Sequence, residues 1–128
     1  MSHFSRIQTQ LTDPTFLLQA LHELGFTVEQ GDLRVDGFMG RQADVQILLK
    51  LENSYGIGLR YTDGVYEIVA DWAGVRGLNQ KQFVQQLTQR YAYCASLAKL
   101  QAQGFTLVEE TRQGDGQIHL VMRRVRNE

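Results

Sequence analysis

IGLRYTDGVYEIVA, residues 57–70, alternates apolar and polar side chains on both sides of Asp63-Gly64. Alternation of this kind is typical of a strand with one buried face, and Asp-Gly is a preferred dipeptide for a two-residue type I′ turn. We therefore predict a β-hairpin whose register is set by the turn. The predicted cross-strand pairs are Ile57 with Ala70, Leu59 with Ile68, Tyr61 with Tyr66 and, on the polar face, Arg60 with Glu67.

On the N-terminal side of this hairpin, the sequence predicts a strand over Phe4–Leu11 and then a helix. Asp13 followed by Pro14 marks the helix start, because aspartate caps free backbone N–H groups and proline suits the first helical position. Leucines follow at helical spacing, and Gly25 is placed to end the helix.

Two further segments before residue 57 are predicted to be extended. FTVEQGDLRV, residues 26–35, is interpreted as a hairpin that turns at Gly31-Asp32. Residues 43–51 form another strand, with its apolar side chains on one side. In the first of these segments the expected pairs are Val28 with Val35 and Glu29 with Arg34.

On the C-terminal side, Asn79 can cap a long helix that runs to Gln103 and stops before Gly104. A last hairpin, FTLVEET with QIHLVMRR, turns through residues 114–116. Two registers fit its pattern, and we prefer the one that places Leu107 opposite Met122.

These elements predict one α+β domain over residues 1–128. Its antiparallel sheet or sheets have about seven or eight strands built from hairpins, and two helices pack on one side. Each helix runs into Gly-Phe-Thr, at residues 25–27 and 104–106, and then into a hairpin. This match is short, and it favours a shared supersecondary unit, an internal pseudo-repeat, without proving duplication.

Composition limits the function classes. The chain has 128 residues, 43% of them hydrophobic, and a net charge of −1, which gives no support to nucleic-acid binding. A single cysteine, Cys94, fits a reducing compartment, and no apolar run is long enough to cross a membrane. We expect a protein of the cytoplasm or of a stroma-like space, with no membrane insertion.

The sequence assembles no metal site or catalytic group. The three histidines are scattered, and Cys94 falls on the apolar stripe of the second helix, where an inert buried thiol is expected. Arginines at positions 123, 124 and 126 form the one basic cluster, which we interpret as a solvated strand end. We predict no cofactor, no metal and no catalytic residue.

Several stretches together resemble a known family. They are the opening MSHFS, YGIG at 55–58, YEIVADW at 66–72, QRYAY at 89–93 and GQIHLVMRR at 116–124. In the same order they are similar to a small family of uncharacterised proteins of cyanobacteria, also encoded as a hypothetical reading frame in algal chloroplast genomes. The resemblance implies a photosynthetic cell, and it carries over no activity and no functional residue.

The candidate site is the connection from Asp71 to Leu78, between the central hairpin and the long helix. Its expected contact residues are Asp71, Trp72, Val75, Arg76 and Leu78, joined by Phe38 and Met39 in the loop GFMGR. Backbone N–H groups at a helix start favour anions, and exposed apolar side chains favour contact with a protein. In the plainer interpretation, Trp72 is a packing residue, Asp71 caps a turn and Arg76 is solvated.

Two hypotheses follow. The first is a non-catalytic binding or assembly protein that contacts a still unidentified protein partner. The alternative is a small-anion or small-ligand-binding domain, or a weak enzyme, centred on residues 71–79. The sequence does not determine the oligomeric state.

Overall fold

The computed structural model describes residues 4–114 and 117–124. The chain divides into two compact units, residues 1–91 and 92–128, and helix α2 (Gln80–Ala102) contributes to both. The predicted turn at residues 114–116 includes positions 115 and 116, which lie outside the described residues, as do positions 1–3 and 125–128.

The hairpin predicted at residues 57–70 is confirmed as strands β4 (Ile57–Thr62) and β5 (Val65–Ala70). Asp63 and Gly64 both have positive φ, 52° and 84°, as a type I′ turn requires. The polar pair is also in place, because Arg60 Nη2 lies 3.0 Å from Glu67 Oε1. The observed pairs include Leu59 with Ile68, Arg60 with Glu67 and Tyr61 with Tyr66.

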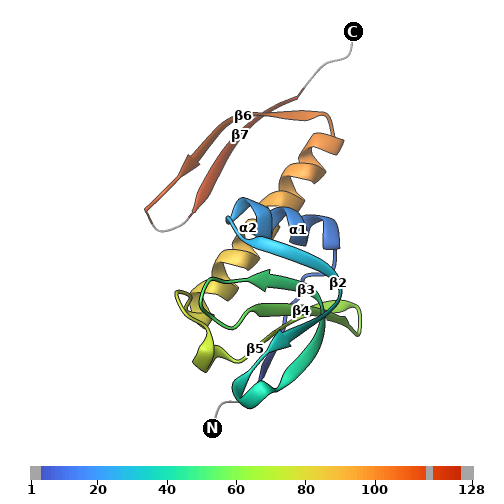
Figure 1. Ribbon diagram of the computed structural model, residues 1–128. Coiled ribbons are helices and arrows are strands. Elements are labelled where there is room, and N and C mark those ends of the chain that lie inside the picture. Colours follow the sequence, from blue (N-terminus) through green and yellow to red (C-terminus); the bar gives the residue numbers. More distant parts are fainter. Residues whose placement is uncertain (1–3, 115–116, 125–128) are drawn as a thin grey trace. The chain divides into compact units, whose positions relative to one another are not determined.

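In the first unit, five strands form one antiparallel sheet in the order β1-β5-β4-β3-β2 (Figure 1). The remaining strands are β1 (Ser5–Gln8), β2 (Thr27–Asp36) and β3 (Gln42–Lys50). Strand β1 is shorter than the predicted Phe4–Leu11. It pairs with β5 alone and therefore forms an edge of the sheet.

The predicted turn at Gly31-Asp32 is wrong. β2 is one strand that pairs with β3, and these two residues form a bulge: Gln30 lies opposite Ile47, whereas Leu33 lies opposite Val45. Gly31 has a φ of 136°, a conformation that a side chain disfavours. The chain reverses instead at residues 37–41, a loop that contains the short 3₁₀ turn Phe38–Gly40.

The bulge explains why the sequence was misinterpreted. One extra residue reverses the inside–outside alternation of a strand. Val28 and Leu33 therefore face the same side, opposite Leu49 and Val45 of β3, although an unbroken strand would place them on opposite sides. A two-residue hairpin turn would produce the same change in the pattern.

Beyond the bulge, β2 and β3 close over a second small core. Val35, Ala43, Val45 and Val69 form a buried cluster, with Phe4, Leu33 and Leu48 packed against it. Val69 alternates with Ile68 along β5, so this cluster covers the face of β5 that points away from Ile68. Gly58 lies beneath it, and a Cβ atom added there would collide with the Val45 side chain.

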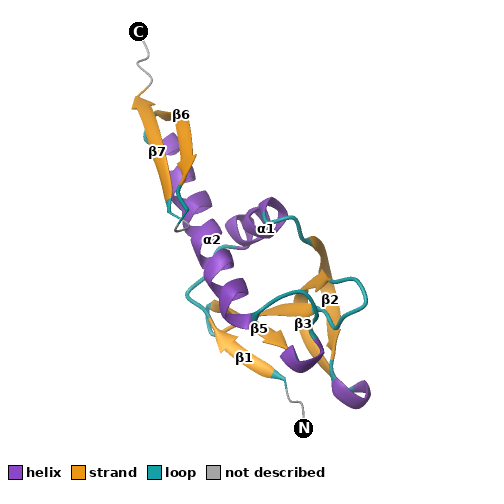
Figure 2. Cartoon of the chain, turned by 90° about the vertical axis from the view of Figure 1, so that its left-hand side faces the viewer, coloured by secondary structure: helices purple, strands orange, loops and turns teal. Residues whose placement is uncertain are grey.

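Two helices cover the other face. Helix α1 (Pro14–Glu23) begins as predicted, because Asp13 Oδ1 accepts a hydrogen bond from Thr15 N over 2.8 Å. Asn79 Oδ1 caps α2 in the same way, accepting from Gln82 N over 3.1 Å. Figure 2 shows α1 and the first turns of α2 on the same side of the five-stranded sheet. Leu17, Leu21, Phe83 and Leu87 are fully buried.

The second unit consists of α2 from Ala92 onward and the antiparallel pair β6 (Phe105–Arg112) and β7 (Ile118–Arg124). Leu107 lies opposite Met122, so the preferred register is confirmed. The Tyr93 hydroxyl lies 3.0 Å from Glu110 Oε2. Within the described part of this unit, Cys94 alone is buried, and Val108 and Val121 of the hairpin are half exposed, at 51% and 49%.

The predicted shared supersecondary unit is present twice. α1 is followed by Gly25 at a φ of 89° and a bulged antiparallel pair, and α2 is followed by Gly104 at a φ of 91° and another bulged pair. Glycine suits both helix ends because it adopts positive φ without strain.

Gly58→Ala tests the packing beneath the second core. We expect the substitution to lower the free energy of unfolding by about 1–3 kcal/mol, the usual cost of overpacking a filled core. Urea unfolding followed by circular dichroism measures the change. Gly114→Ala is the control, because a Cβ there meets nothing within 4 Å, and it should shift stability by less than about 0.5 kcal/mol. Equal stability of the two variants would contradict the close approach.

Candidate functional site

The connection between β5 and α2 begins with a buried carboxylate. Asp71 is 2% exposed, and its Oδ2 accepts a hydrogen bond from Phe38 N over 2.9 Å. This bond brings together two segments that the sequence analysis had placed in one candidate site, the 71–78 connection and the Phe38-Met39 loop. Asp71 does not cap the 3₁₀ turn Trp72–Gly74 through its side chain.

Trp72 packs against the helix side of the core. Its ring centroid lies 6.0 Å from that of Phe83, and Phe83 also contacts Phe26 at 5.6 Å. The indole Nε1 and Asp71 Oδ1 are both buried, without a hydrogen-bond partner among the described residues. Asp71 and Trp72 are thus mainly packing residues at the base of the connection, and they expose little to a partner.

The middle of the connection is fixed to the turn between β3 and β4. Tyr55 N donates to Gly74 O over 3.1 Å, and Arg76 N donates to Ser54 Oγ over 2.8 Å. Gly74 has no room for a side chain, because a Cβ there would collide with the Tyr55 ring. A polar hollow of about 420 Å³ lies here. Its lining is Asn53, Ser54, Tyr55, Ala73, Gly74 and Arg76.

The predicted contact residues differ in exposure. Val75 is buried, and Leu78 is partly buried, so both lie mainly beneath the surface. Arg76 is exposed, Phe38 is 44% exposed and Met39 is 84% exposed. Met39 also has a φ of 57°, in the left-handed region that side chains seldom adopt. Arg76, Phe38 and Met39 therefore form the accessible part of the predicted site.

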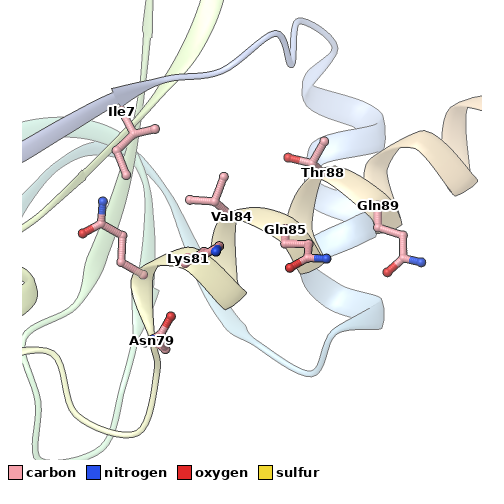
Figure 3. Close-up of a pocket in the computed structure, with 8 residues that line it drawn as sticks. Ile7, Asn79, Lys81, Val84, Gln85, Thr88 and Gln89 are labelled. Carbon is pink, nitrogen blue, oxygen red and sulfur yellow. The ribbon is translucent and has the colours of Figure 1, made fainter. Parts of the chain in front are cut away.

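A larger hollow of about 1000 Å³ opens where the connection enters α2. We call it the α2 groove. It is lined by Ile7 of β1 with Asn79, Gln80, Lys81, Val84, Gln85, Thr88 and Gln89, and Figure 3 labels all of these residues except Gln80. Ile7 and Val84 are its half-buried apolar members, and polar uncharged side chains dominate the rest. Lys81 is the one charged residue among those that line it.

Sequence analysis located one end of this groove and missed the rest. Asn79 was identified as the start of α2, and the rest of the helix was assigned no part in a site. Ile7 lies more than 70 positions earlier in the chain, and nothing in the sequence indicates that β1 runs beside α2. The available signal was the uncharged, glutamine-rich helix face, because an exposed helix face usually carries many charges.

Among the residues that the structure describes, no group of three or more His, Cys, Asp or Glu side chains could hold a metal ion. Burial, and after it the nearby Tyr61, raises the pKa of Tyr66 above the ordinary tyrosine value. Tyr66 lies outside both the connection and the α2 groove.

The basic cluster at the chain end is an exposed strand end as far as it is described. Arg123 and Arg124 are exposed, and the Arg124 guanidinium lies 4.7 Å from the centre of the Phe105 ring. Arg126 lies outside the described residues. Within the described chain, neither helix has the length and apolar character needed to cross a membrane.

Comparison with known proteins supports the family resemblance. A family model described as "Protein of unknown function (DUF1257)" matches residues 20–121. Three relatives called uncharacterized protein ycf35 match nearly the whole chain. The relative from Pyropia yezoensis is 34% identical, and the match covers 97% of this chain and 98% of the relative. The relatives from Cyanophora paradoxa and Guillardia theta are 33% and 35% identical, and each match covers 98% of this chain and 99% of the relative. These relatives are encoded in chloroplast genomes. No solved structure matches the chain.

Cys94 is buried at 2% exposure, as predicted. Ellman's reagent reacts with the cysteine thiolate and must have access to its sulfur. We therefore expect Cys94 to react at least about a hundredfold more slowly in the folded protein than in urea. Absorbance at 412 nm follows the reaction. Modification under native conditions at the rate of a free exposed thiol would show that Cys94 is accessible and would return it to consideration as a nucleophile or redox sensor.

Proposed function

The chain belongs to the DUF1257 family, and from this premise we propose that it is a non-catalytic accessory protein that acts through protein–protein contacts. Its place of action would be the chloroplast stroma or the cytoplasm of a photosynthetic cell, in keeping with its plastid-encoded relatives. The partner would be a protein; neither nucleic acid nor a membrane is required.

The observation that carries this proposal is the α2 groove. An enzyme site needs groups that transfer protons or attack substrate, whereas binding needs an accessible concave surface with apolar and polar parts. The α2 groove has the second set: Ile7 and Val84 provide apolar area, and glutamines provide hydrogen-bonding groups. A charge-poor centre of this kind is typical of protein interfaces.

The exposed part of the connection supplies a second contact surface. Met39 and Phe38 project apolar area from a loop that Asp71 ties to the connection, and Arg76 adds a cation. Methionine, phenylalanine and arginine are all enriched in interfaces. Exposed positions on well-fixed loops are frequent contact sites in proteins.

A second candidate function is favoured by the polar hollow beside Arg76. Asn53, Tyr55 and Arg76 bring donor groups to one concave surface, which suits a small anion such as phosphate. This hypothesis differs from the first in its ligand and in its location, so the two can be tested separately.

Thr88→Trp tests the leading proposal. Thr88 is exposed and lines the α2 groove, so a bulky ring there should fill the groove without disturbing the core. We expect quantitative affinity purification from the source cells to recover the specific partner with Thr88→Trp at least about tenfold less efficiently than with the wild-type protein. A loss of this size is typical when a residue that dominates the binding energy is removed or blocked. Gln86→Trp is the control, because Gln86 is an exposed residue of the same helix that does not line the groove. Equal recovery with both variants would contradict a role for the groove.

Arg76→Ala tests the second surface and the second candidate together. If Arg76 anchors a protein, partner recovery should fall by about fivefold or more at an unchanged melting temperature. If the hollow binds an anion, millimolar phosphate should raise the melting temperature of the wild-type protein and not of the variant. Arg123→Ala controls for loss of charge, because Arg123 is an exposed arginine of β7 that lies outside the connection and the Phe38-Met39 loop. Unchanged recovery and unchanged phosphate response would remove Arg76 from both hypotheses.

A further inference from the structure

We propose that the α2 groove binds an extended segment at the C-terminus of a partner protein, which adds to β1 as a sixth strand and places its carboxylate at the start of α2. This inference rests on the proposed protein-binding function and specifies the chemistry of the partner. Four features of the first unit support it: the open edge, the apolar floor, the amide walls and the charge at one end.

Among the described residues, the edge of the sheet at β1 has backbone groups that pair with no other strand. Thr9 N donates to Tyr66 O over 3.1 Å, and residues along an antiparallel strand alternate between bonding the neighbour and pointing away from it. Ile7, opposite Ile68, therefore bonds β5, whereas the N–H and C=O groups of Arg6 and Gln8 point away from the sheet. Such an edge is a template for an added strand.

The apolar floor lies beside this edge. Ile7 reaches the α2 groove from β1, and Val84 reaches it from α2, as Figure 3 shows. Alternate side chains of an added strand point to one face of the sheet. Every second residue of a bound segment would therefore turn toward Ile7 and Val84, which favours aliphatic residues at those positions.

The walls suit a peptide backbone. Gln80, Gln85 and Thr88 can donate and accept hydrogen bonds, and none carries a charge. The lining of α2 runs from Asn79 to Gln89, about 15 Å at the helical rise, which an extended segment of about five residues spans. The groove thus has the length and the hydrogen-bonding character for a short extended segment.

One end of the groove favours an anion. The first N–H groups of a helix have no partner within the helix, and Asn79 Oδ1 satisfies the one on Gln82. The first turn of α2 contains no acidic residue, and none of the described residues that line the groove is acidic. Lys81 adds a positive charge and forms no ion pair within the described chain. A carboxylate at this end would be stabilised by both the helix start and Lys81.

The same charges disfavour the simplest alternative occupant, β1 of a second copy. That strand reads Ser-Arg-Ile-Gln and carries no carboxylate, so it would leave the start of α2 and Lys81 without an anionic partner. Charge complementarity therefore selects a partner segment that ends in a carboxylate.

The test uses two pools of random peptides, each about six residues long, so that every peptide exceeds the length of the groove. One pool ends in a free carboxylate and the other in an amide. The full-length protein is the bait, and fluorescence anisotropy then gives the affinity of each selected peptide. We expect selected free-acid peptides to carry alternating aliphatic residues and to bind at least about tenfold more tightly than their amidated forms. N-methylation of alternate peptide amides should abolish binding, because it removes the bonds to β1.

Gln85→Glu and Gln86→Glu are the matched variants. They add the same charge to exposed neighbours on α2, of which Gln85 alone lines the groove. We expect Gln85→Glu to weaken peptide binding by about fivefold or more through repulsion of the carboxylate, and Gln86→Glu to have little effect. Equal binding of amidated peptides, or equal effects of the two variants, would overturn the proposal.

Failure of this proposal can be separated from failure of the proposed function. If no peptide is selected while Thr88→Trp still loses its partner and Gln86→Trp does not, the groove binds a folded surface, and the extended-segment proposal is wrong. If sedimentation shows a dimer that Thr88→Trp disrupts, the occupant is a second copy of the chain, and the proposal is again wrong.

Discussion

Val45 of β3 packs directly over the backbone of Gly58 in β4, and the rest of the first unit is arranged around that contact. Because Gly58 has no side chain, the far halves of β2 and β3 can approach β5 and bury Val35, Ala43 and Val69. The sheet thereby gains a core on each face. One face is covered by the sheet's own strands and the other by α1 and α2, and the α2 groove opens beside β1, one of the two edge strands.

The bulge at Gly31-Asp32 is a condition of that packing. It changes the alternation in the middle of β2, so that Val28 and Leu33 face the same side of the sheet. Without the extra residue, one half of the strand would turn its apolar side chains to solvent. The glycine that the bulge requires therefore has a structural explanation and needs no functional one.

The described molecule places its buried and exposed groups in ways that support the proposed binding function. Asp71 is its most strongly buried polar group. One carboxylate oxygen of Asp71 accepts a hydrogen bond from the Phe38 backbone and so positions the Phe38 loop. Its accessible features are the uncharged α2 groove, the Phe38-Met39 loop, Arg76 and the half-exposed valines of the β6–β7 hairpin. Two-stranded sheets are only marginally stable alone in water, so the exposed valines mark this hairpin as a further surface to consider for contact.

The sequence by itself determined the features that depend on neighbouring residues. Asp63-Gly64 set the register of β4 and β5, Asp13 and Asn79 set the helix starts, and the pattern of the last hairpin favoured the register that is observed. Each of these follows from a turn, a cap or an alternation within a few residues. The Gly31-Asp32 turn was misassigned because a bulge and a two-residue turn change the alternation in the same way, and only the pairing partner distinguishes them.

Tertiary structure alone decided the site. The connection at residues 71–78 was recognisable because it precedes a helix start, but its sequence did not reveal that Val75 is buried and Arg76 exposed. Nor did any local pattern place Ile7 beside Val84, because that proximity depends on β1 pairing at the outer edge of β5. A groove between an edge strand and a helix is formed by residues far apart in the chain, and so it exists only once the sheet order is fixed.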